Sequence, residues 1–533
     1  MTTTHGTPKE DAITHVEHAT HAHNIEKADA AAKFLANAHI DHASFTYEEE
    51  RAVLKRIDYR VLPLLLGAYF FQQLDKSSLS YTSIFGLPKD AKLVGTQYSW
   101  LGSILYLAQL VMQPLAAFVL VKLPTGKVIG TAILLWGSSL AIMTSCTNFR
   151  SLLAMRFVLG SFEAMIAPAC VATTTMWWRR SEQTLRTGMW NAMNGITFIV
   201  GSLFTYGLGH INSDSLYKYQ IIFMFCGLLT VAYAGIVLWL MPDSPMKAKY
   251  LTERERIIAV ERLRANQMGI QSGEWKWEQV IETLLDFKTW CWFIAIIAIS
   301  IASGGISTFG NLIIRDFGYT SFQAILFNIP FGAIQIICII GSSWAASRYS
   351  RKGLTIALVA VLPIVGTIMM LTVPRKHKGA LLFGYYLVSC LAAITPLIYA
   401  WHVQNTAGDT KKKCTSAMVF IGMCTGNVIG PLLYSVDDAP LYRPGLISNL
   451  IMFALVAVIS LLIPVYLALL NRRHAKRREA LGKSATRVDE SMLRKKEMQG
   501  KGMEMEGHES REEQDNGFSD LTDMSNEDFI YVY

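Results

Sequence analysis

Two adjacent charged residues, Asp75 and Lys76, lie inside an apolar stretch from Val61 to Tyr81 that is long enough to cross a bilayer. A charge in hydrocarbon costs several kcal/mol, so both side chains must face protein or water rather than lipid. Helical spacing puts Gln72 and Lys76 on one face. We interpret that face as the wall of a solute cavity in which Lys76 binds an anion. The alternative is that the two charges form structural pairs with each other or with neighbouring helices.

A second pair of charges falls in the fourth long apolar stretch, where helical spacing puts Arg156 and Glu163 on one face. A guanidinium binds a carboxylate through two parallel hydrogen bonds, so Arg156 is a further candidate anion ligand. The first and fourth stretches cross the membrane in opposite directions, which brings Lys76 and Arg156 to similar depths. Pairing of Arg156 with Glu163 or Asp75 is the structural alternative.

Buried carboxyl groups are the candidates for proton coupling. Asp75 and Glu163 are the first two, because a carboxyl in a low-dielectric cavity can bind and release a proton during a transport cycle. His402, near the end of the tenth apolar stretch, is a third candidate. A histidine that only hydrogen-bonds neighbouring helices is the alternative there.

Neutral polar side chains within the apolar stretches are candidates for lining the same cavity. They are Gln72, Asn191, Asn194, Asn311, Gln335, Trp401 and Asn405. Each of them is equally suited to a hydrogen bond between helices.

Glycines predict where helices bend or rock against each other. The gating candidates are Gly304 and Gly305 in the seventh stretch and Gly422 and Gly426 in the eleventh. Close helix packing through small residues is the alternative role.

The composition predicts a polytopic membrane protein, because 52% of the 533 residues are hydrophobic and only 17% are charged. Apolar stretches of helical length occur at 61–81, 97–121, 127–147, 151–178, 183–210, 219–241, 289–314, 321–346, 354–374, 379–402, 413–435 and 446–470. A polar segment divides them into six and six. This pattern predicts an all-α fold in which twelve transmembrane helices form two six-helix bundles.

The stretches divide the chain into five regions. We expect disordered cytoplasmic tails at 1–56 and 471–533, bundles at 57–241 and 289–470, and a cytoplasmic linker at 242–288. Thr252 and Glu255 form a capping-box pattern in the linker, and an amphipathic helix follows. Basic residues gather in the connections on one side of the spans, and the positive-inside rule makes that side, with both termini, cytoplasmic.

The sequence lacks motifs of other function classes. Its eight cysteines have no disulfide or metal-ligand spacing, and no GxxxxGK[ST] phosphate loop or paired nucleophile and base is present. We therefore expect a protein that is not an enzyme and that uses neither metal nor cofactor. Its expected partners are a small anionic substrate, protons and the lipid bilayer, and not nucleic acid.

Short motifs resemble the major facilitator superfamily. Basic loops at Lys122–Lys127 and Ser347–Gly353 hold equivalent places in the two halves, although neither carries the Asp of the usual superfamily motif. Other segments resemble the fungal allantoate permease branch of the anion:cation symporters. These are Asp75–Tyr81, Arg156–Ala164, Pro242–Pro245, Ala417–Gly422 with Gly426 and Asn427, and Asp520–Tyr533.

This resemblance implies proton-driven uptake of a small organic anion, such as an allantoate-like ureido acid or a vitamin-like carboxylate, at the plasma membrane. We expect the transporter to act as a monomer. Two alternatives stay open: an exporter of a secondary metabolite with the same fold, and a nutrient sensor that signals without transport.

Overall fold

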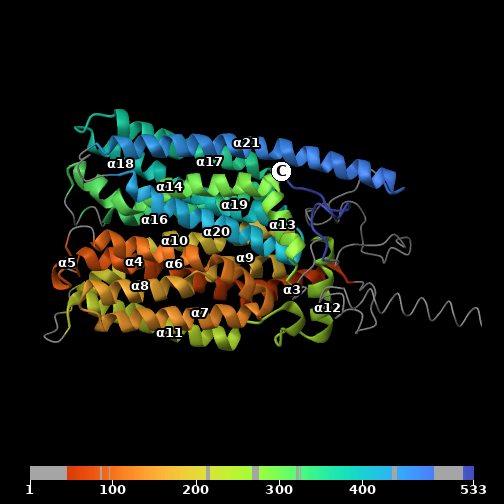
Figure 1. The fold of residues 1–533 in the computed structure, drawn as a ribbon, viewed down its shortest axis with the longest axis horizontal. Coiled ribbons are helices and arrows are strands. Elements are labelled where there is room, and N and C mark those ends of the chain that lie inside the picture. Colours follow the sequence, from red (N-terminus) through yellow and green to blue (C-terminus); the bar gives the residue numbers. More distant parts are fainter. Residues whose placement is uncertain are drawn as a thin grey trace, which may run out of the picture.

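Helices make up all the regular secondary structure in the described part of the chain, as seen in a computed structural model. The structure describes residues 45–533 apart from 85–86, 95–96, 210, 212–215, 267–274, 320–322, 324–325, 435–440 and 485–519. Long helices lie side by side in two layers, one from each half of the sequence (Figure 1). This arrangement confirms the predicted all-α membrane fold.

Each half contributes six long segments within the described residues, and the fourth segment of each half is interrupted. The first half has α4 (Leu62–Ile84), α6 (Gln97–Lys122), α7 (Thr125–Ile142), α8 and α9 (Phe149–Glu163 and Ile166–Trp177), α10 (Arg180–Gly209) and α11 (Lys218–Leu240). The second half has α14 (Phe287–Asp316), α16 (Asn328–Tyr349), α17 (Lys352–Thr372), α18 and α19 (Lys378–Val388 and Ile394–Gln404), α20 (Asp409–Leu432) and α21 (Arg443–Ala480). A 3-10 turn, η4 (Ser389–Ala393), joins α18 to α19. The matching interruption indicates a duplicated architecture.

Ten segments of the described chain are long and apolar enough to cross a membrane. The helices α4 and α10 are not among them, because charged and amide side chains such as Lys76 and Arg186 interrupt their apolar sequence. Both helices line a central cavity, where polar side chains avoid lipid. A hydropathy criterion therefore does not identify α4 and α10 as membrane spans, although these two helices carry many of the polar groups of this cavity.

Several shorter elements gather at one end of the bundles, which we call the linker end, and the opposite end is the far end. They are α3 (Tyr47–Arg60), α12 (Glu253–Glu261), α13 (Trp277–Leu285) and residues 520–533, which we call the tail segment (Figure 1). As predicted, α12 begins at a capping box. The Thr252 hydroxyl accepts from the Glu255 backbone at 3.4 Å, and the Glu255 carboxylate accepts from the Thr252 backbone at 2.9 Å.

The linker is divided between the two halves. Asn266, after α12, accepts a hydrogen bond from the backbone of Arg180 at 3.1 Å and donates one to the backbone of Trp178 at 3.4 Å. These contacts dock the start of the linker on the first half. In α13, the side chain of Gln279 accepts a hydrogen bond from the backbone of Lys411 at 3.0 Å, which docks the end of the linker on the second half.

The two tails differ from the prediction of disorder. Helix α3 begins at Tyr47, within the predicted tail 1–56, and residues 1–44 lie outside the described residues. Helix α21 continues to Ala480, and side chains of the tail segment such as Phe529 have no exposed surface. Disorder is therefore the wrong prediction for both ends of region 471–533, because each end packs on protein. The bundle boundaries at 57–241 and 289–470 stay predictions.

Close packing of α14 on α20 provides a test of this fold. A Cβ atom at Gly426 would lie 2.6 Å from the backbone oxygen of Ile297 and 2.6 Å from Cβ of Ser300. Gly426→Ala should therefore lower the free energy of unfolding by about 1–3 kcal/mol through overpacking. The measurement is the melting temperature of the purified protein in detergent, which should fall.

The matched control is Gly235→Ala in α11, where nothing lies within 4 Å of the position that a Cβ atom would take. Alanine there should raise the free energy of unfolding by about 0.5–1 kcal/mol, because alanine loses less backbone entropy in a helix than glycine does. Equal melting temperatures for the two variants would contradict the packing of α14 on α20.

Candidate functional site

A cavity of about 260 Å³ lies between the two halves. The helices α4, α6 and α10 line it from the first half, and α14, α16, α18, η4, α19 and α20 line it from the second. The described residues at its wall are Tyr69, Gln73, Lys76, Ser77, Tyr81, Tyr106, Asn191, Asn194, Phe198, Ser300, Ser303, Ile306, Ser307, Asn328, Phe331, Gln335, Tyr385, Leu391, Ala392, Thr395, Tyr399, Met423 and Asn427. Hydroxyl and amide groups surround the cavity, so a polar solute can be hydrogen-bonded on several sides.

Lys76 is the one charged side chain among the described residues that line the cavity. Its ammonium nitrogen lies 3.2 Å from a carboxylate oxygen of Glu163, which belongs to α8. The Lys76 side chain is 17% exposed and that of Glu163 is 1% exposed, so the cation reaches the cavity and the carboxylate stands behind it. Tyr106 adds a cation–π contact from α6, with its ring centre 5.9 Å from the ammonium.

Arg156 shares a buried face of α8 with Glu163, as predicted, but it is not among the described residues at the cavity wall. Its guanidinium lies 6.0 Å from the ring centre of Phe223 in α11. The prediction that Arg156 contacts the substrate directly is therefore wrong for this conformation, because the side chain points into the first bundle. The spacing in the sequence predicted that Arg156 and Glu163 share one face of the helix, but it did not predict that Arg156 contacts α11.

Asp75 points away from the cavity and into the first bundle. Its Oδ2 accepts hydrogen bonds from Nε1 of Trp136 at 2.8 Å and from the hydroxyl of Thr230 at 2.9 Å. Adjacent residues of a helix project about 100° apart, which explains why Lys76 reaches the cavity and Asp75 does not. Asp75 thus joins α4 to α7 and α11, and its role in proton coupling stays a prediction.

Both asparagines predicted in α10, Asn191 and Asn194, lie at the cavity wall. Asn191 accepts a hydrogen bond from the Tyr69 hydroxyl at 3.3 Å. Next to Asn191, the ring of Trp190 stacks on Tyr399 of the second half with ring centres 6.2 Å apart. This aromatic contact joins the halves on the linker-end side of Asn194.

Two other predicted residues, Gln72 and His402, do not line the described cavity. Gln72 is buried, and its neighbour Gln73 lies at the wall instead. The ring nitrogens of His402 lie 3.1 Å from the backbone oxygen of Ile398 and 3.2 Å from the hydroxyl of Ser416, so this buried histidine holds α19 against α20. The cavity role predicted for Gln72 is wrong, and the geometry of His402 is that of its structural alternative. The side chain of Asn311 lies outside the described residues.

Trp401 and Asn405 bind the tail segment. Nε1 of Trp401 donates to the backbone oxygen of Val532 at 2.9 Å. The Asn405 side chain accepts from the Val532 backbone at 2.7 Å and donates to it at 3.0 Å. The prediction that they bind substrate is wrong, because α19 continues past the cavity to the linker end and meets the tail segment there.

The four predicted gating glycines lie where α14 meets α20 and the residues after it. A Cβ atom at Gly304 would lie 3.1 Å from Cα of Asn427, and one at Gly422 would lie 2.8 Å from the side chain of Ile296. Gly426 and Gly305 are packed in the same way. Helix α14 is unbroken through this region, so close packing is their visible role and gating stays a prediction.

Hydrogen bonds at the linker end join the two halves, and sequence reasoning missed them. Nε2 of Gln404, the last residue of α19, donates to the backbone oxygen of Arg180 at 2.5 Å and to the hydroxyl of Thr184 at 3.2 Å. Arg180 donates in return to the backbone oxygen of Gln404. The hydroxyl of Ser347 donates to the backbone of Ser181 at 3.1 Å. A basic residue in a predicted loop carries no signal that it binds a glutamine of the other half.

Residues 65–431, well over half of the chain, match the Major Facilitator Superfamily. The chain belongs to the major facilitator superfamily. Among solved structures of this superfamily, the fucose:proton symporter of Escherichia coli aligns with a TM-score of 0.56 at 16% identity. The alignment covers 75% of this chain and 98% of the symporter chain, and at this identity it shows the shared fold alone.

Two similar transporters within the superfamily come from yeast. The chain is 30% identical to the thiamine pathway transporter of Saccharomyces cerevisiae, over 97% of this chain and 96% of that protein. It is 29% identical to the allantoate permease of the same yeast, over 95% of this chain and 90% of that protein. These matches confirm the predicted allantoate permease-like branch. The protein is therefore a multi-pass superfamily transporter and not an enzyme.

The Lys76–Glu163 pair can be tested by removing one partner and then both. Lys76→Met alone leaves the Glu163 carboxylate buried without this ion-pair partner, which should lower the free energy of unfolding by about 3–5 kcal/mol. Adding Glu163→Gln should recover most of that loss, because the unmatched buried charge is then gone. Thermal unfolding in detergent measures both effects.

Lys127→Met is the control for this pair of variants, because the Lys127 side chain is exposed at the linker end. Its free energy of unfolding should stay within about 0.5 kcal/mol of the parent value. A double variant that melts below Lys76→Met would show that Lys76 and Glu163 do not stabilise each other.

Proposed function

We propose that this transporter imports a small organic anion together with a proton by alternating access. The observation that carries the proposal is the position of Lys76, the one charged side chain among the described residues at the wall of a cavity between two bundles. An ammonium in a site with low-dielectric walls attracts a carboxylate far more strongly than an ammonium in water does. Superfamily membership supports transport as the use of this cavity.

The Lys76–Glu163 ion pair supports proton coupling. In the pair, the Glu163 carboxylate occupies the ammonium group that an anionic substrate needs. Protonation of Glu163 cancels its negative charge and releases Lys76 to bind the substrate carboxylate. The net charge of the site is then the same with the ion pair alone as with a proton and an anion bound, so both forms can be enclosed in the membrane at similar cost. This equality would couple the anion to the proton.

Contacts at the linker end support the direction of access. Basic residues gather at this end, so we assign it to the cytoplasm and the far end to the outside of the plasma membrane. In this conformation Arg180 and Gln404 hold the linker end together. Release of substrate into the cytoplasm requires these two residues to separate. One copy of the chain contains the whole cavity, so a monomer is sufficient for transport.

Amide side chains support the choice of substrate class. Asn191, Asn194, Gln335 and Asn427 line the cavity, and a carboxamide group contains both donors and an acceptor. Such groups complement the ureido or carboxamide groups of a substrate, while Lys76 complements its carboxylate. Ureido acids combine both features, and similarity to an allantoate permease favours the same class.

Uptake into vesicles tests the role of Lys76. Radiolabelled allantoate is the first probe, offered to reconstituted protein under a proton gradient with the acid side outside, and other ureido acids and vitamin-like carboxylates follow. Lys76→Gln should lower kcat/KM by roughly tenfold or more, because a hydrogen bond to a charged group contributes about 1.5–3 kcal/mol.

Lys127→Gln removes the same charge from an exposed position and should leave uptake unchanged. Gradient-driven uptake that is the same in Lys76→Gln and the parent protein would refute the assigned ligand. If the parent protein takes up none of these acids, the proposal of anion transport fails.

Glu163→Gln tests the coupling mechanism separately, because glutamine imitates a permanently protonated carboxyl. This variant should still exchange labelled for unlabelled substrate across the membrane. It should not accumulate substrate under a proton gradient, since the ion pair that returns the empty transporter can no longer form. Accumulation at the parent level would show that Glu163 does not carry the coupled proton.

A further inference from the structure

The tail segment packs on the linker end although it contains neither helix nor strand (Figure 1). Its buried side chains are Thr522, Asp523, Asn526, Asp528, Phe529, Tyr531 and Val532. Buried acidic residues such as Asp523 and Asp528 are unusual in a segment of this kind, because carboxylates are seldom buried unless they are paired. The contacts of these side chains with the bundles therefore have to account for the position of the tail segment.

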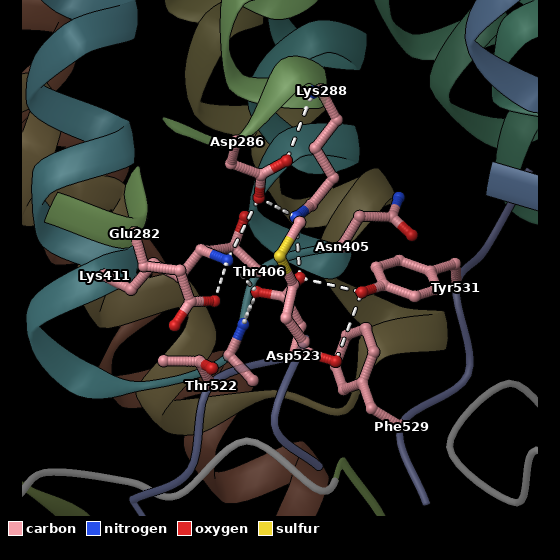
Figure 2. A network of polar contacts seen from close by, with 12 residues as sticks. Glu282, Asp286, Lys288, Asn405, Thr406, Lys411, Thr522, Asp523, Phe529 and Tyr531 are labelled. Carbon is pink, nitrogen blue, oxygen red and sulfur yellow. Dashed lines mark hydrogen bonds and ion pairs between the residues drawn. The ribbon is translucent and has the colours of Figure 1, made fainter. Parts of the chain in front are cut away.

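Asp523 completes a buried cluster of charges (Figure 2). Its carboxylate lies 2.6 Å from Nζ of Lys288 in α14 and 2.9 Å from Nζ of Lys411 in α20. Asp286 binds the same two lysines, and none of these four side chains has any exposed surface. Glu282, which is 25% exposed, binds Lys411 from the solvent side at 2.7 Å. Removal of Asp523 leaves two fully buried ammonium groups beside a single fully buried carboxylate.

The charge of Asp523 is stable in this cluster. Burial alone would raise the pKa of Asp523, but the ammonium groups of Lys288 and Lys411 outweigh burial and hold the pKa below its usual range. The Tyr531 hydroxyl also donates a hydrogen bond to the Asp523 carboxylate at 2.9 Å. Salt screens buried ion pairs only weakly, and the loss of one partner leaves a buried charge without compensation. The cluster therefore anchors the tail segment through Asp523.

Backbone hydrogen bonds extend the anchor across the second bundle. Besides the contacts of Val532 with α19, the Asn471 side chain of α21 accepts from the Tyr531 backbone at 2.8 Å and donates to it at 2.9 Å. The backbone nitrogen of Lys352, at the start of α17, donates to the Tyr533 backbone oxygen at 2.9 Å. The side chain of Gln279 in α13 also donates to the Asp520 backbone oxygen at 3.2 Å. The tail segment is thus bound by side chains and backbone groups of six elements, α13, α14, α17, α19, α20 and α21.

Arg180 is the residue at which the tail segment meets the first bundle. Its guanidinium lies 4.8 Å from the ring centre of Phe529 and donates to the backbone oxygen of Ile530 at 2.8 Å. The same guanidinium donates to Gln404, which holds the two halves together at the linker end. Since Phe529 is fully buried, its contact with Arg180 is shielded from water and strengthened. A movement that separates Arg180 from Gln404 also removes Arg180 from the tail segment.

We propose that the linker end of the second bundle is a binding site for an acidic, aromatic peptide, that the tail segment occupies it, and that its occupancy holds the linker end closed. Asp523 anchors the segment on the second bundle, while Phe529 and Ile530 hold Arg180 of the first. The tail segment therefore acts as a latch that stabilises the closed linker end and has to release Arg180 when that end opens. This proposal rests on the alternating opening included in the proposed function, but not on the identity of any substrate.

Peptide binding tests the site without any transport measurement. The chain without residues 519–533 is purified in detergent and titrated with a fluorescent peptide that has the sequence of residues 519–533. Binding should be saturable, and an Asp523→Asn peptide should bind roughly tenfold more weakly or worse, because two buried ammonium groups lose a partner. A Glu527→Gln peptide removes the same charge from a contact with Lys483, in which both side chains are 18% exposed. Its affinity should stay within about threefold of the unchanged peptide.

A second measurement uses the full-length chain and reports on the latch itself. Thr184 is 2% exposed and contacts Gln404, so a cysteine at this position reacts with a thiol reagent when the linker end opens. Labelling of Thr184→Cys should become several-fold faster when Asp523→Asn or Phe529→Ala is added. Adding Glu527→Gln should leave the rate unchanged. The chain without Thr184→Cys gives the background from native cysteines.

Each result decides one part of the proposal. When the shortened chain unfolds cooperatively on heating, failure of the unchanged peptide to saturate it, or equal affinity of the Asp523→Asn peptide, would overturn the binding site. Equal labelling rates in the full-length parent, Asp523→Asn and Phe529→Ala forms would overturn the latch, even if the shortened chain fails to fold. Neither readout uses substrate, so an absence of anion uptake in vesicles would leave both results standing.

Discussion

An ionised group inside a membrane protein is stable only where an opposite charge or several hydrogen bonds accompany it. This constraint governs the arrangement of the helices. Asp75 fixes α4 against α7 and α11 through Trp136 and Thr230. The Lys76–Glu163 pair then fixes the next side chain of α4 against α8. Two adjacent charges therefore join α4 to three neighbours and leave one cation at the wall of the cavity.

The number of partners separates structural charges from a charge that is available to a ligand. Lys411 has three carboxylates within 3.0 Å, those of Glu282, Asp286 and Asp523. Lys76 pairs with the carboxylate of Glu163 at 3.2 Å and faces the cavity. Replacing one partner of Lys411 leaves others in place, whereas a single protonation frees Lys76. The cluster around Lys411 thus favours a rigid second bundle, whereas the single partner of Lys76 permits exchange with a ligand.

Prediction from the sequence succeeded where one residue or one segment carries its own signal. Span lengths gave the two bundles, and a charge inside an apolar stretch identified Lys76 at the cavity. It failed where the outcome depends on which helices become neighbours, as for Arg156, whose face turns into the first bundle. Trp401 and Asp523 show a further limit, because a polar tail looks disordered until the buried lysines that bind it are known. No local pattern encodes such pairings between distant segments.

The division of the linker between the halves has a mechanical consequence. Asn266 is fixed to the first bundle, and Lys276, ten residues further along, donates from its backbone to the hydroxyl of Thr410 in the second bundle at 3.2 Å. Ten residues of polypeptide reach at most about 35 Å, even when fully extended. The covalent linker therefore limits how far the two bundles can move apart, although it permits them to tilt against each other. In every conformation of this transporter, the two docked ends of the linker must lie within this distance of each other.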